Sequence, residues 1–166
     1  ARGAALAALV LVLGVGTGVL AGPSVEVPAA QPLLAVVTWP VSSLVISEIQ
    51  TGGASASDEF VEVANQGATT VDLVGLEVSY VTSTGGTVTR KATWPTPTSL
   101  EPGRRILIAN SLGNHASVAD ATYSGGFAAT GGAIVLRPIG GAPLDAVGWG
   151  DATNPFVEGA AAIAPT

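Results

Sequence analysis

Residues Leu44 to Tyr80 read LVISEIQTGGASASDEFVEVANQGATTVDLVGLEVSY, and this stretch decides the fold class. It holds three short apolar runs of strand length, and turn-forming residues separate them. Because side chains alternate along a strand, Phe60 and Glu62 are expected on one face of the second run and Val61 on the other. In the third run, Gly75 predicts a bulge or a close approach of another backbone.

The rest of the chain continues this pattern of short runs and turns. The first run, from Leu44 to Gln50, is expected to place Ile46 and Glu48 on one face and Ile49 on the other. No segment beyond residue 21 shows a 3.6-residue apolar period. Short strands separated by Gly and Pro turns predict an all-β fold, an antiparallel β-sandwich. The expected strands are 44–50, 59–64, 71–81, 87–94, 104–110, 122–127, 133–137 and 143–150.

The N-terminal residues 1–21, ARGAALAALVLVLGVGTGVLA, have the three parts of a secretory signal peptide. Arg2 gives a positive start, an uncharged apolar stretch follows, and the small Ala21 fits a cleavage site. A retained anchor is the alternative, since the apolar run is near the lower limit for spanning a bilayer. We therefore expect a secreted or cell-surface protein that meets a membrane only through an uncleaved leader.

The segment after the leader, residues 22–41, carries Pro23, Pro28, Pro32 and Pro40 and few charges. Proline fixes φ and cannot donate to a strand ladder, so this segment is expected to be an extended linker. The predicted domain organisation is a signal peptide (1–21), a linker (22–41), a β-sandwich domain (42–159) and a short tail (160–166).

Composition narrows the function classes. The chain is 48% hydrophobic but only 11% charged, so it must bury a substantial apolar surface. It has no cysteine, which excludes disulfides, thiolate metal sites and a cysteine nucleophile. The net charge of −6 repels a phosphate backbone, and no long basic cluster offsets it, so no nucleic-acid partner is expected.

Several motifs occur in a fixed order along the chain. D-E-F-V-E-V at 58–63 is followed by Asn65, V-D-L-V-G-L at 71–76 comes next, an L-E-P-G turn lies at 100–103, and D-A-V-G-W-G lies at 145–150. This order resembles the lamin-tail domain family, and its closing hairpin is similar to that of secreted bacterial members. The resemblance implies an immunoglobulin-like β-sandwich that acts as a non-catalytic module, often beside the hydrolase or nuclease domains of exported proteins.

The resemblance and the leader together give the functional expectation. We expect an exported, non-enzymatic lamin-tail domain protein that serves as a binding, structural or spacer module at the cell surface, with a protein or a cell-envelope glycan as its unidentified partner. The alternative is the accessory domain of a secreted enzyme, a nuclease or another hydrolase, whose catalytic part lies beyond Thr166.

Catalytic chemistry has one sequence candidate, His115, the only histidine. A Ser-His-Asp site would need it, but no G-x-S-x-G elbow is present, and the residue lies in a polar stretch typical of a solvated loop. The chain is therefore not expected to be an enzyme. Four aromatic residues either stack on sugars or pack within the core, and packing is favoured: Tyr80, Trp94, Tyr123 and Trp149.

Metal chemistry has one sequence candidate, the acidic cluster of Asp58, Glu59 and Glu62 beside the Gly/Ser-rich loop 52–57. Alternation sends Glu59 away from Glu62, so Asp58 and Glu62 are the pair expected to converge, helped by loop carbonyls. Ca²⁺ accepts irregular oxygen sites of this kind. The other interpretation is that these acids cap a strand and solvate its rim. No cofactor other than Ca²⁺ is expected.

Overall fold

The structure is a computed structural model that describes residues 40–164. The predicted signal peptide, and all of the predicted linker except Pro40 and Val41, lie outside the described residues. Within 40–164 no helix is long and apolar enough to cross a bilayer.

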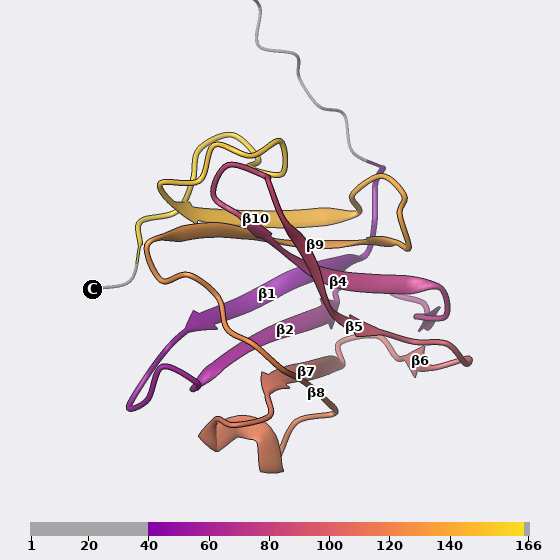
Figure 1. Ribbon diagram of the computed structural model, residues 1–166. Helices are drawn as coiled ribbons and strands as arrows, with labels where there is room; N and C mark the ends of the chain where they lie inside the picture. Colours follow the sequence, from indigo (N-terminus) through magenta and orange to yellow (C-terminus); the bar gives the residue numbers. More distant parts are fainter. Residues whose placement is uncertain (1–39, 165–166) are drawn as a thin grey trace, which may run out of the picture. The chain divides into compact units, whose positions relative to one another are not determined.

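Two four-stranded sheets make up the fold, and the predicted all-β sandwich is confirmed. Figure 1 shows how the labelled strands are arranged. The first sheet has the order β1-β2-β7-β8, formed by β1 (Leu44–Thr51), β2 (Glu59–Asn65), β7 (Arg105–Asn110) and β8 (Ala121–Tyr123). The second has the order β10-β9-β4-β5, formed by β10 (Asp145–Gly150), β9 (Gly131–Pro138), β4 (Leu76–Thr82) and β5 (Val88–Thr93). A small pair, β3 (Val71–Asp72) with β6 (Ser99–Leu100), and one 3₁₀ turn, η1 (Asn114–Ser117), complete the described elements.

The core lies between the two sheets, where the apolar side chains of alternating positions meet. Val61 and Ile108 face inward from the first sheet and are fully buried. Val78, Ile134 and Leu136 face them from the second sheet with the same burial. The opposite placement of Val61 and Phe60 that alternation predicts is therefore confirmed in β2, where Val61 lies in the core and Phe60 faces His115.

The split of the predicted strand 71–81 has a local cause. Gly75 has a φ of +77°, a backbone conformation that side chains with a Cβ rarely adopt, and it separates β3 from β4. Its N–H donates to the carbonyl of Trp94, and its own carbonyl accepts from Ile139. The bulge or close approach predicted at Gly75 is therefore a turn that joins the two short strands.

Strict alternation is wrong in β1. Ile46 pairs with Val63 but Glu48 pairs with Glu62, so Ser47 is an extra residue in a bulge. The bulge shifts the pattern by one residue, and as a result Ile49 packs against the core on the same side as Ile46 while Glu48 is exposed.

The expected antiparallel pairing fails at one edge. β8 runs parallel to β7, with Ile108 opposite Ala121 and Asn110 opposite Tyr123. The strand also ends at Tyr123, so Phe127, expected in this strand, instead lies in a loop and is buried between the sheets. The segment from Ser111 to Asp120, which contains η1, is long enough to bring the chain back to the same end of the sheet.

The C-terminal segment covers the outer face of the second sheet. Phe156 packs on a small cluster made by Val81, Ala133, Val135 and Ala146, which point away from the main core. Beyond it, Ala162 forms a parallel bridge with Trp149, through backbone bonds from Gly150 to Ala162 and from Ala162 to Gly148. The sandwich thus uses residues of the segment 160–166, which the sequence had assigned to a tail.

Candidate functional site

Asp58 lies just before β2 and is buried. Its Oδ1 accepts a hydrogen bond from the backbone N–H of Asn114 at 2.9 Å, and its Oδ2 accepts from the backbone N–H of Ser55 at 2.9 Å and from the Asn114 amide at 3.1 Å. These bonds, the backbone bonds from Asn114 and Ser55 first, lower the pKa of Asp58 below its ordinary value of 3.8, although burial opposes them. Asp58 therefore ties the loop 52–57 to η1.

Glu62, the second predicted Ca²⁺ ligand, has partners of its own. Its Oε1 accepts from the Ser47 hydroxyl at 2.7 Å and pairs with Arg105 at 3.1 Å. Asp58 and Glu62 thus contact different elements, and in residues 40–164 no group of three or more His, Cys, Asp or Glu side chains is arranged to hold a metal ion. Ca²⁺ binding stays a prediction, and calorimetric titration of the chain with millimolar CaCl₂ tests it.

His115 lies in η1 and is half-buried against β2. Its ring meets Phe60 edge to face, with the ring centroids 4.9 Å apart, and its Nε2 lies 3.5 Å from the side-chain nitrogen of Gln50. The predicted solvated loop residue is therefore a packing residue. Its closest polar partner is an amide, whereas a catalytic triad needs a hydroxyl and a carboxylate.

Glu59, the third acid of the predicted cluster, lies on the inner face of the first sheet and is 2% exposed. Its Oε1 accepts from the backbone N–H of Phe127 at 2.7 Å, and its Oε2 accepts from the amide of Asn110 at 3.0 Å. An added Cβ at Gly126 would lie only 3.0 Å from Oε1, so the loop approaches the carboxylate closely because this residue is glycine. Glu59 is therefore an internal brace for the loop between β8 and β9.

Lys91 faces the same loop from β5 and is 6% exposed. Val78 pairs with Ala92 and Ser79 with Arg90, so Lys91 is the extra residue of a bulge and points inward, a feature that the sequence does not reveal. Its ammonium donates to three loop carbonyls and lies over three aromatic rings. These partners are the carbonyls of Ser124, Gly125 and Gly126 at 3.0–3.4 Å, and the rings of Tyr80, Tyr123 and Phe127 at 4.7–5.8 Å.

The charges of Lys91 and Glu59 act on two sides of one peptide group. Lys91 binds the carbonyl of Gly126, and Glu59 binds the N–H of Phe127, which belongs to the same peptide unit. Burial lowers the pKa of Lys91, and the charge of Glu59 partly offsets this effect. Burial, with the negative charge of Glu59, raises the pKa of Tyr123 above its ordinary range.

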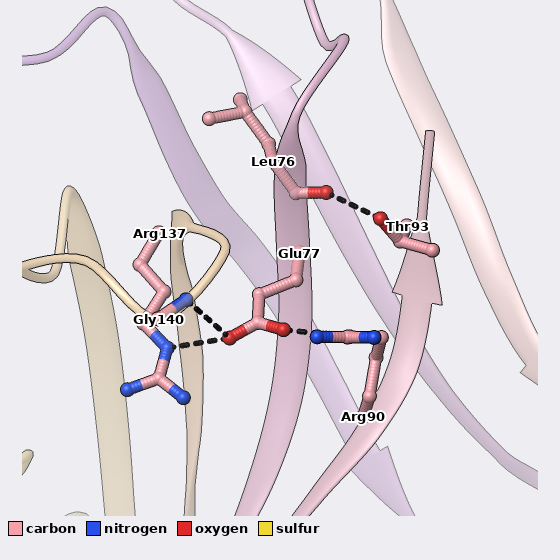
Figure 2. Close-up of polar contacts among 6 residues, drawn as sticks. All are labelled: Leu76, Glu77, Arg90, Thr93, Arg137 and Gly140. Atoms are coloured by element: carbon pink, nitrogen blue, oxygen red, sulfur yellow. Dashed lines mark hydrogen bonds and ion pairs between the residues drawn. The ribbon is translucent and has the colours of Figure 1, made fainter. Parts of the chain in front are cut away.

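A third buried acid, Glu77, lies on the outer face of the second sheet, between two arginines, as Figure 2 shows. Arg90 pairs with its Oε2 at 2.6 Å, while Arg137 at 2.8 Å and the N–H of Gly140 at 3.3 Å bind its Oε1. Burial disfavours the charged form, but the bonds from the arginines outweigh this effect and lower the pKa of Glu77 below 4.5. The cluster joins β4, β5 and β9 and holds the turn after β9.

The aromatic residues named from the sequence are packing residues. Each is at most 7% exposed: Tyr80, Trp94, Tyr123 and Trp149. The predicted core packing is thus confirmed, and none of these rings offers an open face on which a sugar can stack.

A groove of about 590 Å³ runs along the outer edge of β1. Ile46, Ile49 and Gly53 line it from β1 and the following loop, while Trp149 and Ile163 line it from β10 and the C-terminal segment. It is mostly apolar, and its walls come from segments at the two ends of the domain, so no local sequence pattern predicts it.

Comparison with known proteins agrees with this architecture. The family model described as Lamin Tail Domain matches residues 39–151. The chain belongs to the lamin tail domain family. The match begins just before the first strand of the domain and ends directly after β10. A search of curated protein sequences finds no match. The resemblance read from the motif order is confirmed, and membership of the secreted bacterial branch stays a prediction.

Proposed function

We propose that this lamin tail domain is an exported, non-catalytic module that binds a protein or cell-envelope glycan, or spaces other components, at the cell surface. The family match and the leader at residues 1–21 support the proposal. Its non-catalytic part depends on one observation, which is the way the fold uses its buried acids.

Both oxygens of each buried carboxylate, in Asp58, Glu59 and Glu77, accept hydrogen bonds from loops or strands of the domain. A general acid or base must lie within hydrogen-bond reach of a substrate atom, whereas these three side chains are at most 3% exposed. Among residues 40–164, the lining of the groove along β1 contains a single carboxylate, Glu48, and no histidine. These buried carboxylates therefore stabilise the fold. This arrangement favours a binding or spacer function over a catalytic one.

Export is tested on protein from the native host. N-terminal sequencing should find a mature chain that begins near Gly22 and lies outside the cytoplasmic membrane. Recovery of an intact 4–20 segment in the membrane fraction would instead indicate an anchored protein, and recovery from the cytoplasm would contradict the proposal.

The competing function, an accessory domain of a secreted enzyme, is tested on the gene. Sequence encoding a nuclease or other hydrolase after Thr166 would favour it. His115 is the sequence candidate for catalysis by the domain itself, so a purified His115→Ala chain that lost a hydrolase activity of the parent would contradict the non-catalytic assignment. A Gln66→Ala chain is the matched surface control.

A further inference from the structure

Within the described residues, the outer edge of β1 has no hydrogen-bond partner for most of its length. β1 pairs with β2 on one side and forms the edge of its sheet on the other. Near its start, the N–H of Leu44 binds the Ser42 hydroxyl and the N–H of Ile46 binds Asp145 at 2.6 Å. No other bond from outside the sheet reaches the β1 backbone within residues 40–164. An unpaired edge of this kind accepts an added strand.

The groove described above runs beside this open edge. Ile49, Val147 and Trp149 give it apolar walls, and Ile163 stands at its rim with 93% of its surface exposed. Its volume of about 590 Å³ lies within the range of ligand sites. A free strand edge beside apolar walls fits an extended peptide. The main chain of the peptide would pair with the edge of β1, and every second side chain of the peptide would pack against the apolar walls.

Charge identifies the peptide more closely. Glu48 is the only charged residue that lines the groove, it is exposed, and no ion pair within the described part of the chain neutralises it. The chain as a whole carries a net charge of −6. Both features favour a basic side chain in the ligand, and they disfavour a second, equally acidic copy of this chain. A glycan is disfavoured because Trp149 is only 4% exposed and offers no stacking face.

We propose that the groove between β1 and β10 binds an extended segment of a partner protein, which adds to β1 as a fifth strand and places a Lys or Arg beside Glu48. The inference rests on the proposed function, because it assigns a site and a ligand class to the binding module. The two proposals have separate tests. Absence of peptide binding at the groove would contradict this inference and leave the export proposal unaffected.

The experiment starts with a random nine-residue peptide library panned against the 166-residue chain. Selected peptides should alternate apolar residues and carry a Lys or Arg, and in ¹⁵N spectra they should shift the amide signals of Ser47–Gly53 and of Val147 and Trp149. N-methylation of alternate peptide nitrogens should abolish binding in one of the two possible registers, because it removes the donors that face β1.

Charge reversal provides the matched test. Glu48→Lys should weaken binding about five- to tenfold, since an exposed attraction becomes a repulsion. Glu101→Lys makes the same change in net charge at an exposed site outside the groove and should leave affinity within about twofold.

Several results would overturn the proposal. They are a panning that enriches no peptide, peptide-induced shifts that lie away from β1, and equal effects of Glu48→Lys and Glu101→Lys. A chain that elutes as a dimer, and whose dimer is broken by changes at Glu48, would show that the edge serves a second copy. Binding of cell-envelope glycan fragments at the same signals would reassign the ligand class.

Discussion

At the scale of single residues, both faces of the first sheet contribute to stability. Ile106 faces the core and Phe60 faces His115 on the outer side, and both are 8% exposed. We expect Ile106→Ala and Phe60→Ala each to lower the free energy of unfolding by about 2–5 kcal/mol, because each truncation leaves a cavity. Urea denaturation measures both. Val118→Ala, at an exposed position, is the control and should change it by less than about 0.5 kcal/mol.

The buried pair Lys91 and Glu59 gives a second residue-level prediction. Lys91→Met should lower the free energy of unfolding by about 1–3 kcal/mol or more, because the carbonyls of the loop 124–126 lose their donor. Glu59→Gln should also destabilise the fold. If the charges act through their shared peptide group, the double variant will cost less than the sum of the single variants. Strict additivity would show that the two charges are independent, and Arg104→Met serves as an exposed control.

At the scale of elements, the segment after β10 behaves as part of the sandwich. Ala162 exchanges two backbone hydrogen bonds with β10, accepting from Gly150 and donating to Gly148. A chain that ends at Gly159 should therefore be less stable by about 1–3 kcal/mol, at the usual net value of a hydrogen bond. A chain that ends at Ala164 keeps both bonds and is the control. Equal urea midpoints for the two shortened chains would contradict this role.

The strands were largely predictable from the sequence, whereas the bulges and one strand pairing were not. Alternation and glycine turns predicted almost every strand, because each signal is local. The bulges at Ser47 and Lys91 were missed, since one extra residue changes which face a side chain occupies without changing composition. The parallel pairing of β8 was missed for a related reason: partner choice depends on the path of the loop before it.

For the candidate site, the limits of prediction have the same origin. Asp58 and Glu62 are close in sequence, yet each finds its partners in a distant segment, Asn114 for one and Arg105 for the other. Glu59 points away from Glu62, as alternation predicts. Its burial against Phe127 could not be predicted, because the two residues are 68 positions apart in the sequence and meet only in the folded domain. The groove along β1 likewise needs both ends of the domain to be in place.

At the scale of the whole molecule, the buried acids predict how stability depends on pH. The pKa of Asp58 lies below 3.8 in the folded chain, and that of Glu77 lies below 4.5. The unfolded chain therefore binds protons more readily, so the stabilisation is fully present above these ordinary values and is lost as the pH falls through the lower, folded pKa values. The melting temperature should stay high near neutral pH and fall steeply below about pH 4.

Two variants separate this effect from general acid sensitivity. Asp58→Asn should melt at a lower temperature near neutral pH, because the amide cannot accept all the bonds of the carboxylate, and should lose less on acidification. Glu101→Gln removes an exposed carboxylate and should follow the parent chain at every pH. Differential scanning calorimetry across the pH series measures all three chains. If Asp58→Asn and the parent lose stability in parallel as the pH falls, the proton uptake belongs to other carboxylates and Asp58 is only a neutral brace of the loop.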